Sequence, residues 1–487
     1  MSTNRTTRVA AASLLTISLA LGACTAPNLG PRPQMTAPEA LESSQSLAAA
    51  TAASRNWPRE RWWTAYGDPQ LDALVDEALA GSPSVAAAQA RIRQARGASE
   101  VAGAATLPTL GGQGSAGFTK QSYNNGVPAD FVPKGWNSTG TLALTGDFDL
   151  DLWGANRKAL AAATSEEAAA EADARQAELL ISSNVVSSYF DLARLIERGN
   201  ALADAIEARN AFVDLTGRRS REGIDNQAPW RRAEAAAATA RAEFSANQEQ
   251  VLLRRHALAA LLGKGPDRGL TITPPSIATL SETGVPADAA IALAGRRPDI
   301  VAARLRAEAA GARIDQAKAA YMPNISLRGL VGLTSLGLSN LIDTGSTYGN
   351  AGGAFSLPIF QGGRLRGQYT QARGGYDAAV ANYNETVLGA LQEIADAVAS
   401  REAAAAQERD AAEAARKSQI GYDLSMQRFR GGLSSYLEAL TAQTDALAAR
   451  RAAVDAHFRT LALEVALQRA LGGGFAHNSS EKASDHE

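Results

Sequence analysis

The sequence predicts a protein of long α-helices and transmembrane β-strands, built from two copies of one strand-and-helix unit. Three features lead to this fold class: an export signal that ends at the only cysteine, an ordered series of matches between the two halves of the chain, and Pro-free helical segments of unusual length. Aromatic residues make up only 6%, and Ala, Arg, Glu and Gln dominate long stretches, which is typical of extended helices.

Composition also excludes several classes of function. A net charge of −2 and a pI near 6.2 leave no basic surface for nucleic acid. Four histidines and one cysteine are too few to suggest a metal cluster, and the many helical carboxylates are not paired with histidine in a catalytic pattern. We therefore expect no catalytic residues, no metal, no cofactor other than a covalent lipid, and no nucleic-acid partner.

The N-terminus reads as an export signal over residues 1–23. Arg5 and Arg8 precede an apolar stretch that is too short to span a membrane. The segment Leu21-Gly22-Ala23-Cys24 resembles a bacterial lipoprotein box, in which cleavage leaves Cys24 as a lipid-bearing N-terminus. Thr25 is not acidic, which by resemblance to lipoprotein sorting signals favours the outer membrane. Residues 24–56, rich in Ala, Pro, Ser and Gln, are expected to form a lipid-anchored linker.

The remainder of the chain is an internal duplication. Pro108 matches Pro323 at an offset of 215 residues, and Gly223 matches Gly432 at an offset of 209, within an ordered series of such pairs. The matches predict repeat 1 at residues 57–278, repeat 2 at residues 279–474, and a disordered polar tail at 475–487.

Each repeat contains two segments of alternating apolar and polar residues, which predict β-strands. These segments lie at 110–118, 136–152, 325–333 and around 355–359. In the second of them, Leu142, Leu144 and Phe148 lie on one face, while Thr145 and Asp147 lie on the other. Strands of this length and period suit a transmembrane barrel with an apolar face toward lipid and a polar face toward the lumen.

The strands bear on the oligomeric state. No apolar run long enough for a transmembrane helix follows the export signal, so a membrane-spanning part must consist of strands. Four strands cannot close a barrel, and open sheet edges are not tolerated in lipid. We therefore expect several chains to share one barrel.

Two very long helices are predicted, from about Asn156 to Arg221 and from about Arg364 to Arg430. Each would extend about 100 Å at 1.5 Å per residue, which is unusual for a globular domain. After the second glycine break a 4-3 spacing of apolar residues predicts a coiled-coil stripe on the following helix. Its positions are Leu433, Leu437, Leu440, Thr444, Leu447, Arg451, Val454, Phe458, Leu461, Val465 and Gln468.

Five segments together resemble a known family, the TolC-like outer membrane factors of tripartite efflux and secretion systems, and within it the lipoprotein (NodT-type) branch. They are Trp62-Trp63 through Leu71, Arg297-Pro298-Asp299-Ile300, Tyr321-Met322-Pro323, Leu357-Pro358-Ile359-Phe360 with Gly362-Gly363, and Ala470-Leu471-Gly472-Gly473-Gly474. The resemblance implies a homotrimer in the cell outer membrane, with a twelve-stranded β-barrel continued by an α-helical barrel in the periplasm. It also implies two partners, a periplasmic adaptor protein and an inner-membrane transporter of the resistance-nodulation-division class.

The same resemblance assigns the site residues. The helix–helix turns are expected to form the periplasmic tips that dock the adaptor, through Arg221, Gly223, Ile224, Arg430, Gly432 and Leu433. The gate that closes the resting channel is expected just after the second turn, at Leu437, Glu438 and Thr441. Many members of the family carry Asp where this chain has Thr441, which puts a cation-binding ring in doubt. The alternative role of Leu437 is helix packing.

Two apparent motifs have a simpler explanation. Residues 112–117 fit the spacing G-x-G-x-x-G, but neither a helical pattern nor an acidic partner follows, so a glycine-rich strand is favoured. Asp147, Asp149 and Asp151 resemble the start of a calcium loop, yet Leu152 and Lys158 replace the required Gly and Glu.

The sequence thus predicts a passive outer-membrane conduit for small molecules, opened by an iris-like movement of helix tips. Two alternatives stay open: a conduit for type I secretion of polypeptides, which shares the fold, and a structural periplasmic lipoprotein without a pore. Nothing in the sequence identifies the substrate.

Overall fold

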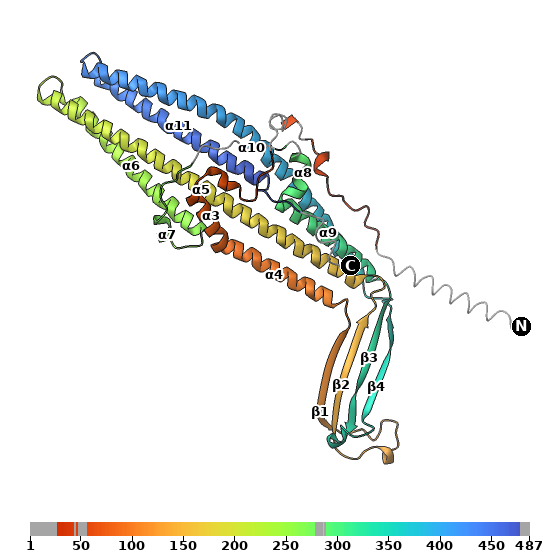
Figure 1. The fold of residues 1–487 in the computed structure, drawn as a ribbon. Helices are drawn as coiled ribbons and strands as arrows, with labels where there is room; N and C mark the ends of the chain where they lie inside the picture. The colour runs from red at the N-terminus through yellow and green to blue at the C-terminus, as the bar shows by residue number, and fades with distance from the viewer. Residues whose placement is uncertain (1–26, 43–44, 47–55, 278–285, 287–288, 478–487) are drawn as a thin grey trace. The chain divides into compact units, whose positions relative to one another are not determined.

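The structure is a computed structural model that describes residues 27–42, 45–46, 56–277, 286 and 289–477. Within them, helices and strands occur in two series of the same order (Figure 1). The first series is α3 (Pro69–Gly81), α4 (Pro83–Ala104), β1 (Thr109–Thr119), β2 (Asn137–Asp149), α5 (Ala155–Arg221) and α6 (Gln227–Leu261). The second is α8 (Ala289–Arg296), α9 (Pro298–Ala319), β3 (Asn324–Leu336), β4 (Thr347–Ser356), α10 (Arg364–Arg430) and α11 (Tyr436–Ala470).

Three of the four pairs of equivalent helices have equal lengths. Helices α4 and α9 have 22 residues each, α5 and α10 have 67, and α6 and α11 have 35. The two long helices predicted from the sequence are confirmed, with a start at Ala155 rather than Asn156 in the first. None of the described helices combines the length and apolarity needed to cross a membrane.

The compact units of the fold do not coincide with the repeats. One unit contains residues 92–169 and 303–382 together with the chain up to Met35, and includes all four strands. The other contains residues 36–91, 170–302 and 383–487. Each unit therefore draws on both repeats.

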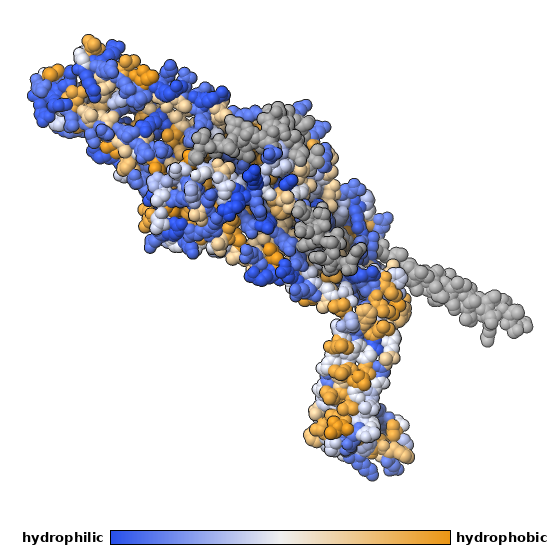
Figure 2. Space-filling model, viewed as in Figure 1, coloured by the Kyte–Doolittle hydropathy of each residue, from blue (hydrophilic) through white to orange (hydrophobic). Residues whose placement is uncertain are grey.

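The four strands form one antiparallel sheet in the order β1-β2-β3-β4 (Figure 1). Leu144 pairs with Val331, while Asp147 pairs with Arg328 at an ion-pair distance of 3.3 Å. Because directly opposed residues share a face, the register confirms one apolar face and one polar face. Leu144 and Val331 are 65% and 63% exposed, so in one chain the apolar face is uncovered. Figure 2 shows hydrophobic residues along these strands.

The fourth strand lies earlier in the chain than predicted. The apolar residues Phe355, Leu357 and Ile359 placed it around 355–359, but β4 spans Thr347–Ser356 and ends before Leu357. Pro358 has no N–H to donate, which ends the ladder. The strand itself is rich in Gly and Ala, so periodicity of apolar side chains could not locate it.

Residues 28–33, which composition assigns to a linker, make specific contacts with α10 and α9. The buried guanidinium of Arg373 donates hydrogen bonds to the carbonyl oxygens of Gly30, at 3.1 Å, and Pro31. Tyr376 Oη donates to the carbonyl of Pro33 at 3.2 Å, and Arg32 pairs with Asp315 at 3.2 Å. The chain shortly after Cys24 is therefore held against the helices.

Two of the motifs that carry the family resemblance stabilise the unit formed by residues 36–91, 170–302 and 383–487. Asp68 caps α3, accepting hydrogen bonds from the N–H groups of Gln70 and Leu71 and, at 2.6 Å, from Tyr189 Oη. Burial and this hydrogen bond raise the pKa of Tyr189. Arg297 makes a two-pronged ion pair with Asp299, with contacts of 3.1 and 2.7 Å.

Each repeat closes with a Leu-Gly pair directly after its last long helix, α6 or α11, and the structure explains why the second residue is glycine. Gly263 and Gly472 have φ angles of +69° and +84°. A Cβ at Gly263 would lie 2.2 Å from the carbonyl oxygen of Gly81, and one at Gly472 would lie 2.0 Å from that of Arg296. Only glycine allows both the left-handed backbone and this close approach.

Replacing Gly472 with Ala should therefore destabilise the protein by about 2–4 kcal/mol, from the left-handed strain and the backbone clash together. The matched control is Gly421→Ala, because Gly421 is an exposed residue of α10 where an added Cβ meets nothing. That control should be neutral or stabilising. Thermal unfolding of the two variants beside the wild type measures the difference, and equal midpoints for both variants would contradict the explanation.

Candidate functional site

The two long helices end in the same turn, which leads into the next helix. The N–H of Ile224 donates to the carbonyl of Arg219 at 2.9 Å, and that of Leu433 donates to Arg428 at 2.8 Å. Gly223 and Gly432 supply the required positive φ of +72° and +74°. This is the Schellman arrangement that satisfies the last carbonyls of a helix. The following helices are capped by Asn226 and Ser435, which accept hydrogen bonds from the N–H groups of Ala228 and Glu438.

The predicted docking residues all lie on the outside of these turns. Arg221, Gly223, Arg430 and Gly432 are exposed, and the side chains of Ile224 and Leu433 are 59% and 73% exposed. An added Cβ at Gly223 or Gly432 would meet nothing. Each tip thus presents an aliphatic side chain and an arginine beside an open glycine.

An aromatic cluster joins the two tips. It is formed by Phe212 of α5, Ala233 of α6, Met426 and Phe429 of α10, and Tyr436 and Ala439 of α11. The ring of Tyr436 stands edge-on to Phe212 at a centroid distance of 5.6 Å and to Phe429 at 6.2 Å. Arg219 lies over Phe429 and also donates to Asp225 at 2.6 Å, a hydrogen bond that raises the pKa of the guanidinium.

The three predicted gate residues lie on the exposed side of α11, in its first two turns. Leu437 is 56% exposed, Glu438 and Thr441 are exposed, and Thr441 Oγ1 donates to the carbonyl of Leu437 at 2.9 Å. Their neighbours Tyr436 and Ala439 are buried in the aromatic cluster. Leu437 is therefore not a packing residue within its own chain.

The coiled-coil stripe predicted for α11 is wrong near the tip and right farther along. The buried positions there are Tyr436, Ala439, Gln443 and Ala446, each one residue before a predicted position. From Phe458 onward the predicted Leu461, Val465 and Gln468 are buried. Alanines are small and let the helices approach closely. The prediction followed the spacing of large apolar residues, so it did not detect these alanine positions.

Three ion pairs connect α11 to the first helix pair farther from the tips. Arg194 of α5 pairs with Asp455 at 3.2 Å, and Asp204 of α5 pairs with Arg450 at 2.6 Å. The third pair joins Glu243 of α6 to Arg451. Neither this ladder of ion pairs nor the aromatic cluster could be predicted from the sequence, because both depend on which helices lie side by side.

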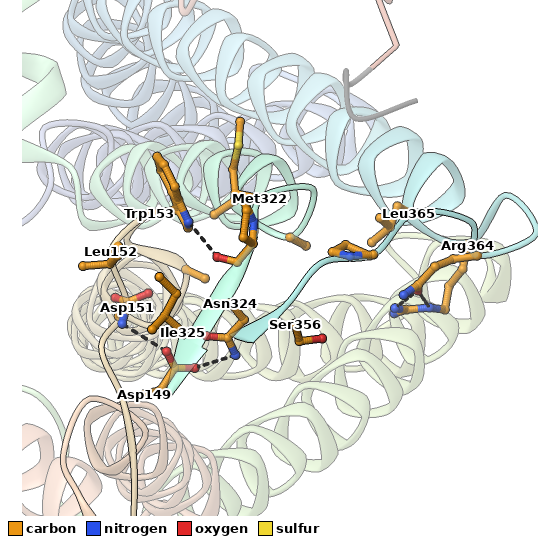
Figure 3. A pocket seen from close by; sticks show the side chains of 16 residues that line it. Asp149, Asp151, Leu152, Trp153, Met322, Asn324, Ile325, Ser356, Arg364 and Leu365 are labelled. Carbon is orange, nitrogen blue, oxygen red and sulfur yellow. Dashed lines mark hydrogen bonds between the residues drawn. The ribbon is translucent and has the colours of Figure 1, made fainter. Parts of the chain in front are cut away.

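Where β2 and β4 lead into α5 and α10, a cavity of about 240 Å³ lies between strand ends and helix starts (Figure 3). Asp149 and Asp151, once considered as a calcium loop, line it. Asp151 accepts hydrogen bonds from the N–H groups of Asn156 and Arg157 at 3.0 and 2.9 Å. Burial opposes a lower pKa for Asp151, but these hydrogen bonds and the Arg157 guanidinium outweigh it and lower the pKa. Among the described residues no group of three potential metal ligands occurs, and Cys24 lies outside them.

Comparison with known proteins gives a consistent result. A family model described as outer membrane efflux protein matches residues 74–264 and 291–473. The chain is 34% identical to the fusaric acid resistance protein FusA of Burkholderia cepacia over 373 residues, 75% of this chain and 69% of that protein. It is 28% identical to the multidrug resistance outer membrane protein MdtP of Escherichia coli over 453 residues, 91% of each.

Solved structures agree on the fold. The outer membrane protein VceC of Vibrio cholerae superposes with a TM-score of 0.82 at 41% identity, covering 86% of this chain and 100% of that one. The outer-membrane channel OprN superposes with a TM-score of 0.83 at 26% identity, covering 93% and 99%. The fold class predicted from the sequence is confirmed.

Proposed function

The chain belongs to the outer membrane efflux protein family, and from this premise we propose that it conducts small molecules outward for a proton-driven pump of the inner membrane. It is an outer-membrane efflux channel component, and its relatives are efflux channels. Channels of this family are homotrimers that work with adaptors and inner-membrane transporters. Conduction through such a channel makes and breaks no bond, so the proposal includes no catalysis and no cofactor.

Small-molecule efflux is favoured over polypeptide secretion by the relatives. FusA and MdtP are named for resistance to fusaric acid and to multiple drugs. A third relative, the pyoverdine export outer membrane protein OpmQ of Pseudomonas putida, is 27% identical over 474 residues. Their substrates are small molecules of unrelated chemistry, which suits a passive conduit. The discriminating observation is which type of inner-membrane exporter co-purifies with the trimer.

The outward position of Leu437 is the single observation that best supports a gate. The aromatic cluster fixes the orientation of α11 through Tyr436 and Ala439, so Leu437 and Glu438 must project from the opposite side. In a trimer, three copies of these side chains would meet around one axis. Glu438 would supply the acidic ring that Thr441 lacks.

We also propose that the chain is anchored by lipid on Cys24. The lipoprotein box supports this, and so does the docking of residues 28–33 only a few positions later. An acyl chain contributes roughly 0.8 kcal/mol per buried CH₂, and stable anchoring takes two signals; here the membrane-spanning sheet would be the second.

The gate is tested by replacing Leu437 and Glu438 with Ala together. The wider and less charged constriction should raise single-channel conductance and antibiotic leak several-fold, because an apolar seal and an acidic ring are both removed. Leu424→Ala, at an aliphatic residue of α10 that is 56% exposed like Leu437, serves as the control and should leave conductance unchanged. Wild-type conductance in the double variant would remove both residues from the gate.

Adaptor docking is tested with Gly432→Val. A bulky β-branched residue at a positive φ both strains the turn and fills the open surface beside Leu433, so crosslinking of the adaptor to the tip should fall. Gly367→Val, where an added Cβ also meets nothing but far from the tips in sequence, is the comparison variant. If Gly432→Val crosslinks as fully as the wild type, the adaptor does not dock at this turn.

The anchor is tested with Cys24→Ser, which should abolish incorporation of a radiolabelled fatty acid, since serine offers no thiol. Thr25→Ser leaves the thiol in place and should label normally. Undiminished labelling of Cys24→Ser would refute the anchor without affecting the channel proposal.

A further inference from the structure

A collar of exposed apolar residues lies where the strands lead into the long helices. Leu152 and Trp153 follow β2, and Leu357, Ile359 and Phe360 follow β4; their side chains are 38–89% exposed, with Phe360 the highest. The collar continues the apolar face of the sheet, on which Phe355 is 66% exposed. Figure 2 shows hydrophobic residues at this junction. Aromatic and aliphatic residues in such a position are typical of the boundary between lipid and water.

The helix starts that follow the collar differ between the two repeats. In repeat 1, Arg157 pairs with Asp151 at 3.3 Å, and Lys158 lies 3.8 Å from Asp315. Those cations are therefore balanced by carboxylates of the chain. At the 209-residue offset that relates α5 to α10, Arg366 is the counterpart of Arg157, and Phe360 stands where repeat 1 has Asp151.

Repeat 2 thus has the cations without the carboxylate. Arg364 donates to the side-chain oxygens of Gln361, at 2.8 Å from Nε, and of Gln368, both uncharged. Arg366 is exposed. Among the described residues, neither guanidinium forms an ion pair with a carboxylate. Arg364 lines the cavity of Figure 3 together with Trp153 and Met322. Asp151 lines it too, but its carboxylate is already held by the N–H groups of Asn156 and Arg157 and by the Arg157 guanidinium.

We propose that this surface, made of the collar with Arg364 and Arg366, binds anionic phospholipids of the periplasmic leaflet. The collar would contact the acyl chains. Because residues two apart on a helix point to different sides, Arg364 and Arg366 would each bind the headgroup phosphate of a different lipid, a group for which guanidinium is well suited. The lipids would supply the negative charge that Asp151 supplies in repeat 1. The proposal goes beyond conduction and rests only on the outer-membrane location of the family.

The test uses the full-length trimer in nanodiscs, with a bimane fluorophore on Ile359→Cys and the parent without that substitution to report any label at Cys24. Brominated phosphatidylglycerol should quench the fluorophore at a mole fraction about fivefold lower than brominated phosphatidylethanolamine, since each arginine near the surface favours an anionic headgroup. The double variant R364Q/R366Q should lose this preference. The control R409Q/R416Q, which removes the same two charges at exposed residues of the same helix, should keep it.

Three outcomes would overturn the proposal. Absence of quenching by either lipid would mean that another chain or segment covers the collar. Equal quenching by both lipids, or an undiminished preference in R364Q/R366Q, would mean that the arginines do not select the headgroup. Trimer size and channel conductance, measured on the same samples, report separately on folding and on the conduit.

Discussion

The constraint on which the rest of the structure depends is that backbone N–H and C=O groups cannot be left unpaired in lipid. The sheet order places β1 and β4 at the two edges, each with one side that has no strand beside it among the described residues. Every unpaired group in hydrocarbon costs several kcal/mol, so an isolated four-stranded sheet is not a stable membrane structure. Pairing of β4 with β1 of another copy satisfies both edges at once, and the homotrimers of this family close twelve strands in this way. A closed barrel gives the polar face a lumen.

Duplication gives the two halves one scaffold while leaving their surfaces free to differ. The close approach of Gly263 to Gly81 is repeated by Gly472 and Arg296, and the Schellman turn at Gly223 is repeated at Gly432. The three pairs of helices that lead into or out of these contacts and turns, α4 and α9, α5 and α10, and α6 and α11, agree in length to the residue. Side chains outside such contacts diverge: Leu437 occupies the position of Ala228 in repeat 1. The proposed gate therefore lies where the repeats differ.

The sequence was sufficient for the fold because its signals are local or repeated. Helices α5 and α10 could be predicted from the absence of Pro and from the glycine that follows each of them. Strands β2 and β3 could be predicted from the alternation of apolar and polar residues. The strand β4 was misplaced because glycine carries no periodic signal, and the buried stripe of α11 was misplaced because its contacts at the tip are alanines. The aromatic cluster and the ion-pair ladder were beyond reach, since each depends on which helices lie side by side. The turn residues could be located from the sequence. That Leu437 points outward could be seen only once the structure showed Tyr436 packed in the aromatic cluster.

The cluster and the ladder differ in strength, and that difference limits how the tips can move. Partly exposed ion pairs such as Asp204–Arg450, with side chains 61% and 46% exposed, contribute about 0–1 kcal/mol each, and salt screens them. Burying an aromatic side chain contributes about 1.5–3 kcal/mol, and Phe212, Phe429 and Tyr436 are 1%, 3% and 6% exposed. Separating the two hairpins of one chain at the tip would therefore cost several times more than breaking one rung of the ladder. If the proposed gate opens by movement of the tips, the less costly movement keeps the cluster intact, so that the two hairpins of each chain move as one body. A partner that binds both tips of one chain, as the matching glycine turns permit, is well placed to drive such a movement.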